Sequence, residues 1–285
     1  MKYLYYPGCS LEGTALEYDR STRALFQALG IELIEIEGWT CCGASAAEAE
    51  SDLLSYALPA RNLAVAESMD ESIKDILVPC SACYLNLRRA AEETRKNPDL
   101  LKRVNQALEP EGLKLQSAKR VRHLLDVLVS DIGAEGLAGY LQSSMDQYRV
   151  ALYYGCQCLR PYKVFDDPED PTSMEPLILA TGASIHDWRM GAKCCGASLM
   201  NIQPEIAQEM VAAILSGASG ADAIVTVCPM CQMNLEGYQN QVSRSAHQDL
   251  HRPILYLPQF LGLAMGIDPR NLSIEMNLSS VSAFI

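Results

Sequence analysis

One arrangement of cysteines occurs twice in this chain of 285 residues. In each half, a single cysteine is followed by an adjacent pair with a glycine after it, and then by a Cys-x-x-Cys motif. The two sets are Cys9, Cys41, Cys42, Cys80, Cys83 and Cys156, Cys194, Cys195, Cys228, Cys231. Such self-similarity indicates an internal duplication in which both halves fold in the same way.

Residues around the cysteines repeat as well. Segment 4–9 matches segment 152–156, Gly43-Ala44 matches Gly196-Ala197, and segment 83–87 matches segment 231–235. The distances between matching segments are similar but unequal, which fits two folded copies with different loops. We therefore predict two domains, residues 1–146 and residues 147–285, with the connection in residues 131–147.

Short apolar runs alternate with helical stretches in both halves. Strands are expected over residues 3–6, 31–36, 75–78, 150–154, 184–187 and 223–227. Helices are expected over residues 14–29, 46–67, 83–95, 174–181, 204–216 and 231–238. Residues 121–128 and 254–261 are each expected to begin as a strand and pass into a helix.

This alternation predicts an α/β fold, because parallel strands need crossover helices. We expect two homologous domains, each a small parallel, Rossmann-like sheet flanked by helices, related by pseudo-two-fold symmetry. Each cysteine cluster follows a predicted strand. In open parallel sheets, ligands gather outside the carboxyl ends of the strands, so the cysteines of one half are expected to converge.

Composition and charge exclude several classes of protein. The formal net charge of −12 argues against binding to a nucleic-acid backbone, which needs clustered Lys and Arg. The longest apolar stretch, residues 253–267, is broken by Pro258 and Gln259 and is shorter than the roughly 20 residues of a membrane span. The first residues already belong to the repeat, so we expect no cleavable leader.

Cysteine usage favours metal-bound thiolates in the cytoplasm. Eleven cysteines in 285 residues are a lower density than that of small disulfide scaffolds. Cys-x-x-Cys alone also serves zinc and thioredoxin-type sites, but a dithiol redox site needs no further cysteines. Structural zinc takes four ligands, whereas each set offers five thiols.

An iron-sulfur cluster suits the adjacent pairs better than one small ion. Neighbouring side chains diverge, and a cluster presents several metal atoms, while Gly43 and Gly196 let the backbone approach closely. A regular cubane cluster uses four cysteines. The fifth thiol indicates an unusual cluster geometry or an idle cysteine, and spacing alone leaves both open.

These motifs resemble the CCG-domain family and, within it, the B-type subunits of the heterodisulfide reductases. The resemblance covers nearly the whole chain. Beyond the cysteine sets, it rests on segments 79–87, 123–125, 165–174 and 223–235.

The resemblance implies a disulfide reductase subunit with two noncubane 4Fe-4S clusters. One cluster would be held by Cys9, Cys41, Cys42, Cys80 and Cys83, and the other by Cys156, Cys194, Cys195, Cys228 and Cys231. In that family a disulfide substrate binds between the two clusters. Electrons arrive from a small ferredoxin-like subunit, which a flavin subunit supplies. We expect a cytoplasmic protein that partners can hold at a membrane surface.

Other residues have candidate roles. His123 is a candidate proton donor, although a histidine at the start of an apolar helix is more often packed, and Tyr256 is its counterpart in the repeat. Asn86 and Asn234 are expected to hold the cysteine loops by hydrogen bonds. Cys158 has no counterpart and is interpreted mainly as a buried thiol. The acidic loop 166–171 either borders the site or is simply solvated.

An alternative function is an electron-relay or membrane-docking subunit of a respiratory dehydrogenase, such as a succinate dehydrogenase-like or glycolate or lactate oxidising system. CCG domains occur there too, often with one intact cysteine set or a fused ferredoxin domain. Two full sets and no additional ferredoxin run favour the disulfide enzyme. A zinc-binding scaffold is the third interpretation. The chain lacks a Gly-x-Gly-x-x-Gly fingerprint, so it needs partners to obtain electrons.

Overall fold

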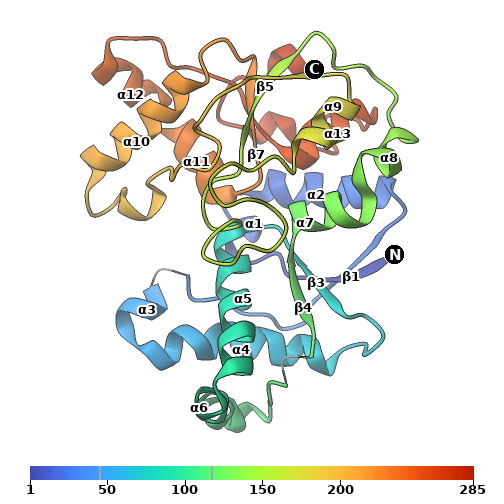
Figure 1. Ribbon diagram of the computed structural model, residues 1–285, viewed down its shortest axis with the longest axis vertical. Helices are drawn as coiled ribbons and strands as arrows, with labels where there is room; N and C mark the ends of the chain where they lie inside the picture. The colour runs from blue at the N-terminus through green and yellow to red at the C-terminus, as the bar shows by residue number, and fades with distance from the viewer. Residues whose placement is uncertain (45, 117) are drawn as a thin grey trace.

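Two four-stranded sheets form the centre of the molecule (Figure 1). The computed structural model describes residues 1–44, 46–116 and 118–285. The strand orders are β2-β1-β3-β4 and β6-β5-β7-β8, and each described pairing is parallel. The strands are β1 Lys2–Tyr5, β2 Glu32–Glu35, β3 Asp75–Val78, β4 Arg120–His123, β5 Arg149–Tyr153, β6 Ser184–Ile185, β7 Ala223–Thr226 and β8 Ile254–Tyr256.

Helices connect and cover the strands. In the first half they are α1 Cys9–Glu12, α2 Leu16–Ala28, α3 Ala46–Glu50, α4 Asp52–Ser68, α5 Ser81–Lys96, α6 Pro98–Leu108, α7 Leu124–Val127 and α8 Gly133–Ala138. In the second half they are α9 Glu175–Ala180, α10 Pro204–Gly217, α11 Pro229–Gly237, α12 Gln239–Ala246 and α13 Leu257–Ala264. Within the described ranges, no helix has both the length and the apolar character needed to cross a bilayer.

The equal strand order of the two sheets confirms the predicted duplicated α/β fold. Strands of a parallel sheet are covered on both faces, which is why they appear in the sequence as continuous apolar runs. In β3, for example, Ile76, Leu77 and Val78 are fully buried. The predicted passage from strand to helix is also confirmed, as β4 leads into α7 and β8 leads into α13.

Local hydrogen bonds explain where helices differ from expectation. The single helix expected over 46–67 is two helices, and the Ser51 side chain caps the second by accepting the Leu54 N–H. Pro98 follows the end of α5 as expected but also begins α6, with Asn97 as its cap. The predicted connection, 131–147, contains the short helix α8.

The strand expected over 184–187 ends at Ile185. Its partner β5 continues to Tyr153, but other groups bind the end of β5. The Gly191 carbonyl accepts the N–H groups of Tyr154 and Gly155, and the Trp188 indole donates to the Leu152 carbonyl. These bonds take the place of a longer β6.

The two halves meet through reciprocal contacts. Helix α2 of the first half packs against α13 of the second, and α9 of the second packs against α8 of the first. In Figure 1 the second half lies above the first, with α2 and α13 between the two sheets. Aromatic rings repeat this exchange, since Tyr18 stacks on Tyr256 and Phe165 stacks on His123. Such reciprocity is the sign of a two-fold relation.

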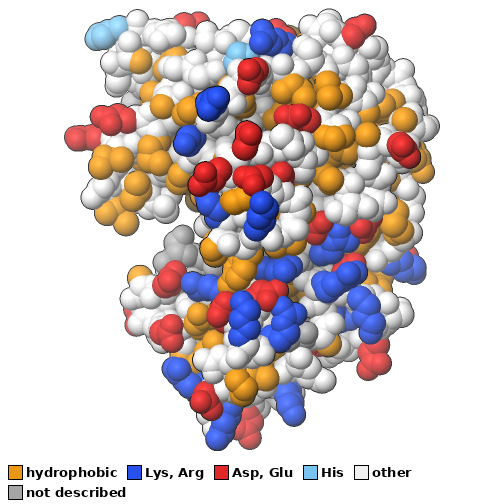
Figure 2. Space-filling model, in the orientation of Figure 1, with side chains coloured by type: hydrophobic (Ala, Val, Ile, Leu, Met, Phe, Trp, Pro, Cys, Tyr) orange, Lys and Arg blue, Asp and Glu red, His pale blue; other side chains and the backbone are white. Residues whose placement is uncertain are grey.

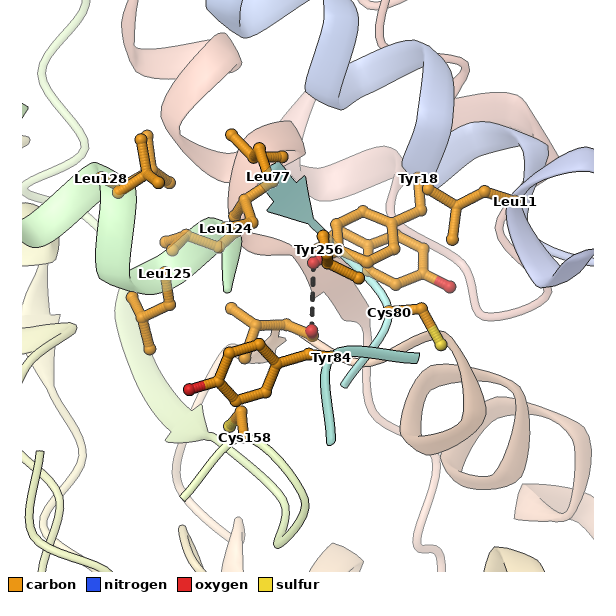
Figure 3. Packing of buried hydrophobic residues seen from close by; sticks show 14 of the residues in the cluster. Leu11, Tyr18, Leu77, Cys80, Tyr84, Leu124, Leu125, Leu128, Cys158 and Tyr256 are labelled. Carbon is orange, nitrogen blue, oxygen red and sulfur yellow. Dashed lines mark hydrogen bonds between the residues drawn. The ribbon is translucent and has the colours of Figure 1, made fainter. Parts of the chain in front are cut away.

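Tyr18 joins the two halves at their centre. Its ring lies 4.1 Å from that of Tyr256, beside Cys80 in Figure 3. Its hydroxyl lies 3.2 Å from the Pro79 carbonyl and 3.0 Å from the Val227 carbonyl. Pro79 and Val227 each precede the first cysteine of a Cys-x-x-Cys motif, so one hydroxyl holds equivalent points of both repeats.

We expect the substitution Tyr18→Phe to lower the free energy of unfolding by about 1 kcal/mol, because a buried hydrogen-bond donor is lost. Tyr18→Ala should cost about 3–5 kcal/mol, because the stacked ring is lost as well. Urea denaturation of the full chain measures both. The control is Tyr140→Phe, at an exposed tyrosine, which should stay within about 0.5 kcal/mol of the parent. Equal stability of Tyr18→Phe and the parent would contradict the bridging role.

Candidate metal centre

The first cysteine set lies at the carboxyl edge of the first sheet. Cys9 begins α1 after β1, and Cys41 and Cys42 follow β2. Cys80 is the N-cap residue of α5, which follows β3, and Cys83 lies in the first turn of that helix. Parallel strands place these three loops side by side, as the sequence predicts.

The five sulfur atoms of this set are linked by pairwise contacts. The Sγ atoms of Cys9 and Cys41 are 4.0 Å apart, and those of Cys42 and Cys83 are 3.3 Å apart. Hydrogen bonds between thiols also link Cys41 with Cys42 and Cys83 with Cys80. All five predicted residues are therefore brought together.

The second set repeats this arrangement at the edge of the second sheet. The Cys156 thiol contacts that of Cys194, and the Cys231 thiol contacts those of Cys195 and Cys228. Cys228 is the N-cap residue of α11, as Cys80 is of α5. Within the described residues, no group of three or more His, Cys, Asp or Glu side chains is arranged to hold a single metal ion.

Some sulfur atoms in each set are stabilised as thiolates. Hydrogen bonds from the Cys41 and Cys83 thiols lower the pKa of Cys42 to about 3. In the second set, the Cys156 thiol lowers the pKa of Cys194 to about 6, and the Cys231 thiol lowers that of Cys228 to about 7. The thiolate is the form of cysteine that binds metals.

Glycines leave room beside the sulfur atoms. Gly8 has φ +74°, and a Cβ atom there would lie 2.8 Å from the Cys83 Sγ. Gly155 has φ +72°, and its Cβ would lie 2.9 Å from the Cys231 Sγ. Both glycines directly precede a cysteine. The missing side chains let the sulfur atoms of Cys83 and Cys231 approach the backbone closely.

Each set has an open side. Cys9 and Cys41 are exposed and Cys156 and Cys194 are half-buried, whereas the other cysteines of the two sets are buried. Figure 2 shows a hollow at the left of the molecule, between α3 and the loop that leads into α10. These elements follow Cys41-Cys42 and Cys194-Cys195 in the chain. The hollow thus borders the segments that follow both adjacent pairs.

Asn86 and Asn234 hold the loops with the adjacent cysteines. The side-chain amide of Asn86 donates to the Cys42 carbonyl at 3.3 Å, and that of Asn234 donates to the Cys195 carbonyl at 2.6 Å. The predicted hydrogen-bonding role of both asparagines is confirmed. Such bonds fix the loops from which the ligands project.

His123 lies in the packed interface between the halves. It is fully buried, and burial lowers its pKa to about 4, so the ring is neutral at pH 7. Its Nδ1 accepts the Leu125 N–H, which leaves the proton on Nε2, 3.2 Å from the Ser81 Oγ. Its role as a proton donor stays a prediction.

Cys158 and the acidic loop are bound mainly by nearby backbone. Cys158 is buried, burial raises its pKa, and its thiol donates to the Tyr154 carbonyl at 3.2 Å. Asp166 accepts backbone N–H groups of Asp167, Thr172 and Ser173. The loop borders a cavity of about 820 Å³ that also reaches Lys193, next to Cys194.

Sequence reasoning missed two residues at the centre of the interface, Tyr18 and Ser81. Ser81 is buried and contacts His123 from the first half and Val227 from the second. Its position between Cys80 and Cys83 was the available signal. The repeat aligns it with Pro229, so this hydroxyl exists in one half and not in the other.

Known proteins resemble the chain along nearly its whole length. The family model described as CCG, cysteine-rich domain, matches residues 3–88 and 150–236. The 8-methylmenaquinol:fumarate reductase membrane anchor subunit of Wolinella succinogenes is 36% identical, over 97% of this chain and 96% of the relative. The B-type subunit of the ferredoxin:CoB-CoM heterodisulfide reductase of Methanosarcina mazei is 31% identical, over 95% of this chain and 91% of the relative.

Two further comparisons agree with these. A protein of Archaeoglobus profundus that is described as similar to the B-type heterodisulfide reductase subunit is 30% identical, over 96% of this chain and 93% of the relative. A crystal structure of a hypothetical protein from Helicobacter pylori has a TM-score of 0.80 at 17% identity, and the match covers 98% of this chain but 52% of that one. At this low sequence identity, the match to the crystal structure shows a shared fold and nothing more.

We expect Gly8→Ala to destabilise the protein more than Gly133→Ala. Both glycines have positive φ and extended ψ, which costs an alanine roughly 1–3 kcal/mol. A Cβ at Gly133 meets nothing within 4 Å, whereas at Gly8 it meets Cys83. The contact with Cys83 should add about 1–3 kcal/mol to the loss of stability in Gly8→Ala. Urea denaturation of metal-free protein measures the difference, and equal losses would contradict the tight approach at Cys83.

We expect His123 to make the protein less stable in acid. Its folded pKa of about 4 lies below the unfolded value of 6.5, so the unfolded chain binds more protons between these values. Stability should therefore fall as the pH drops from about 6.5 to about 4, by on the order of 3 kcal/mol from this group. Denaturant titrations across this pH range should show that the free energy of unfolding falls less steeply in His123→Gln than in the parent. Parallel curves for both proteins would contradict a buried neutral ring.

Proposed function

The chain belongs to the cysteine-rich CCG family, and from this membership we propose that it is the catalytic subunit of a heterodisulfide reductase or a closely related complex. It would reduce a disulfide, or form one in the reverse direction. The observation that carries the proposal is the presence of two complete five-thiol sets in one chain, each gathered at the edge of its own sheet. Homology to B-type heterodisulfide reductase subunits over nearly the whole chain supports it.

We propose that each set holds one noncubane 4Fe-4S cluster. The ligands would be Cys9, Cys41, Cys42, Cys80 and Cys83 for the first and Cys156, Cys194, Cys195, Cys228 and Cys231 for the second. The thiol contacts within each set and the glycines beside Cys83 and Cys231 support this assignment. Each set holds five thiols, one more than a regular cubane cluster uses, which favours an unusual cluster.

Such clusters, when bound, supply electrons one at a time. Reductive cleavage of one disulfide bond consumes two electrons and two protons and yields two thiols. A chain with two ligand sets has the matching electron count. The exposed sulfur atoms of Cys9 and Cys41 and the half-buried ones of Cys156 and Cys194 leave a path for a disulfide to approach, while the remaining ligands are shielded from water.

His123 is our candidate for supplying a proton. Its Nε2 carries the hydrogen, and the ring is anchored through Nδ1 and by stacking on Phe165. Because the ring is neutral, Nε2 can give up its proton only if Nδ1 gains one at the same time, so otherwise it donates a hydrogen bond to the Ser81 Oγ, 3.2 Å away. Tyr256, the counterpart of His123, stacks on Tyr18 and caps α13, so we assign it to packing.

The proposed protein works in a complex. We expect a small ferredoxin-like subunit to deliver electrons and a flavin subunit to supply them, because the sequence has no nucleotide-binding fingerprint of its own. We place the complex in the cytoplasm, with membrane attachment through partners. Within the chain, residues 1–146 and residues 147–285 would be the two CCG domains, each with one cluster.

A second candidate function rests on the 36% sequence identity to a fumarate reductase membrane anchor subunit. In that case the chain would carry electrons between a membrane-bound donor and a partner enzyme, with no disulfide as substrate. The two functions share the iron-sulfur sites and differ in the acceptor. Reduction of a disulfide by the purified complex would support the first function. Electron transfer that depends on added quinol and membranes would support the second.

The experiment is anaerobic purification of the full chain with its partners, followed by iron and sulfide analysis, electron paramagnetic resonance and trial reduction of disulfides. We expect Cys42→Ser or Cys195→Ser to lose about half of the iron, because one of two clusters is lost. Disulfide reduction should fall to background in both variants, because both electrons are needed.

Cys158→Ser is the matched control, since Cys158 is a buried cysteine outside both sets. It should keep its iron and its activity. Full activity and full iron in Cys42→Ser or Cys195→Ser would overturn the ligand assignment. A colourless, nearly iron-free protein from anaerobic cells would overturn the proposed function.

A further inference from the structure

The cavity beside the acidic loop 166–171 has the size and the place of a ligand site. Its volume is about 820 Å³, and its lining includes Leu152 of β5 and Ile185, the last residue of β6. Sites for small molecules usually measure about 300–1,000 Å³. Ligands of open parallel sheets bind outside the carboxyl ends of the strands, and this cavity lies at that edge of the second sheet.

Two segments that are longer in the second repeat form this cavity. Residues 157–174 lead from the second cysteine set into α9, whereas residues 10–15 lead from the first set into α2. Residues 186–193 join β6 to the adjacent cysteines, whereas residues 36–40 do so after β2. Both longer segments line the cavity. The added residues thus serve the cavity and not the thiols, which both repeats gather equally.

The corresponding place in the first repeat holds a smaller groove of one charge. Its volume is about 410 Å³, and its lining includes Glu12, Glu35 and Glu37 but no Lys or Arg. The second repeat therefore differs both in the size of the space and in the basic residues that it brings there.

Charged side chains of both signs line the larger cavity. The following ones form no ion pair with any residue that the structure describes: Arg189, Lys193, Asp187, Glu169, Asp170 and Glu175. The basic ones and Asp187 lie on the loop after β6, and the other carboxylates lie on the acidic loop and at the start of α9. Opposite charges that border one space without pairing are available to a molecule that carries both signs.

Arg160 holds the two segments at a fixed distance from each other. One guanidinium nitrogen donates to the Pro168 carbonyl at 3.0 Å, and another donates to the Ala192 carbonyl at 2.7 Å. The acidic loop is thereby tied to the loop that leads to the second adjacent cysteine pair. The charged groups of the cavity are thus positioned by their backbones, before any molecule binds.

His186 offers a hydrogen-bond acceptor that no described group uses. The side chain lines the cavity and is 9% exposed. Its Nε2 lies 3.0 Å from the Gly217 carbonyl, which can only accept, so the ring hydrogen is on Nε2 and Nδ1 is an acceptor. Among the described residues, Nδ1 has no donor. Buried polar atoms nearly always have a partner, and a bound molecule with N–H groups can supply one here.

We propose that this cavity binds a small zwitterionic molecule, an amino acid or a short peptide. Its carboxylate lies at Arg189 and Lys193, and its ammonium group lies at the carboxylates of the acidic loop and of α9. A molecule with negative charge alone would be repelled by the carboxylates, and one with positive charge alone would be repelled by the basic side chains. The inference does not depend on the proposed disulfide chemistry.

The test is isothermal titration calorimetry of the full chain, purified anaerobically, with three peptides of equal length. Trialanine carries both charges, its N-acetyl form lacks the ammonium group, and its C-terminal amide lacks the carboxylate. We expect trialanine to bind at one site per chain. Each blocked form should bind at least about tenfold more weakly, because one set of charge-assisted hydrogen bonds is lost.

Substitutions at exposed side chains of the cavity assign the two ends of the peptide. Arg189→Gln should weaken trialanine about fivefold and leave the amide form nearly unchanged. Glu169→Gln should weaken trialanine by a similar factor and leave the N-acetyl form nearly unchanged. Lys163→Gln is the matched control, because this exposed lysine pairs with Asp167 and lies outside the lining of the cavity. It should bind all three peptides like the parent.

The outcomes keep this inference apart from the proposed function. No saturable binding of trialanine, or equal affinity for the three peptides, would overturn the site. Equal losses in Arg189→Gln and Lys163→Gln would overturn it too, because the effect would then follow net charge alone. Either result leaves the disulfide chemistry standing, whereas an iron-free chain that binds trialanine would support the site and overturn the proposed function.

Discussion

Parallel strand pairing is the constraint on which the rest of this molecule depends. Because all strands of a sheet point the same way, the loops after β1, β2 and β3 meet at one edge, and so do those after β5, β6 and β7. Cysteines that are far apart in sequence become neighbours without any bond between them. An antiparallel sheet of the same strands would send alternate loops to opposite edges and separate the thiols.

The second organising feature is the exchange of helices between the halves. With α2 on α13 and α9 on α8, helices of each half pack against helices of the other. The same exchange lets the Tyr18 hydroxyl bind the carbonyls of Pro79 and Val227, which directly precede Cys80 and Cys228. The contact that stabilises the pair of sheets is thus the contact that links the two candidate sites.

Much of this could be predicted from the sequence, for physical reasons. Strand β3 was predicted to the residue, because an apolar run bounded by charged and proline residues has clear ends. The cysteine sets and the two asparagines followed from the repeat, which is visible without any structure. By contrast, β6 depends on competition from Trp188 and Gly191 for the end of β5, which no local pattern records.

Tyr18 and Ser81 were beyond prediction for a related reason. Both contact Val227 of the second half, more than a hundred residues away, and these contacts exist only once the halves have docked. The helix predicted over 14–29 contains Tyr18, whereas the helix predicted over 83–95 begins after Ser81, the first residue of α5.

Unequal exposure of the two sets has a consequence for survival in air. Cys9 and Cys41 are exposed, whereas their equivalents Cys156 and Cys194 are half-buried. Exposed cysteine sulfur is the first to meet dissolved oxygen and peroxide. Oxidative damage should therefore begin at the first repeat, and a partly inactivated preparation would be a population of half-intact molecules rather than a mixture of intact and empty ones.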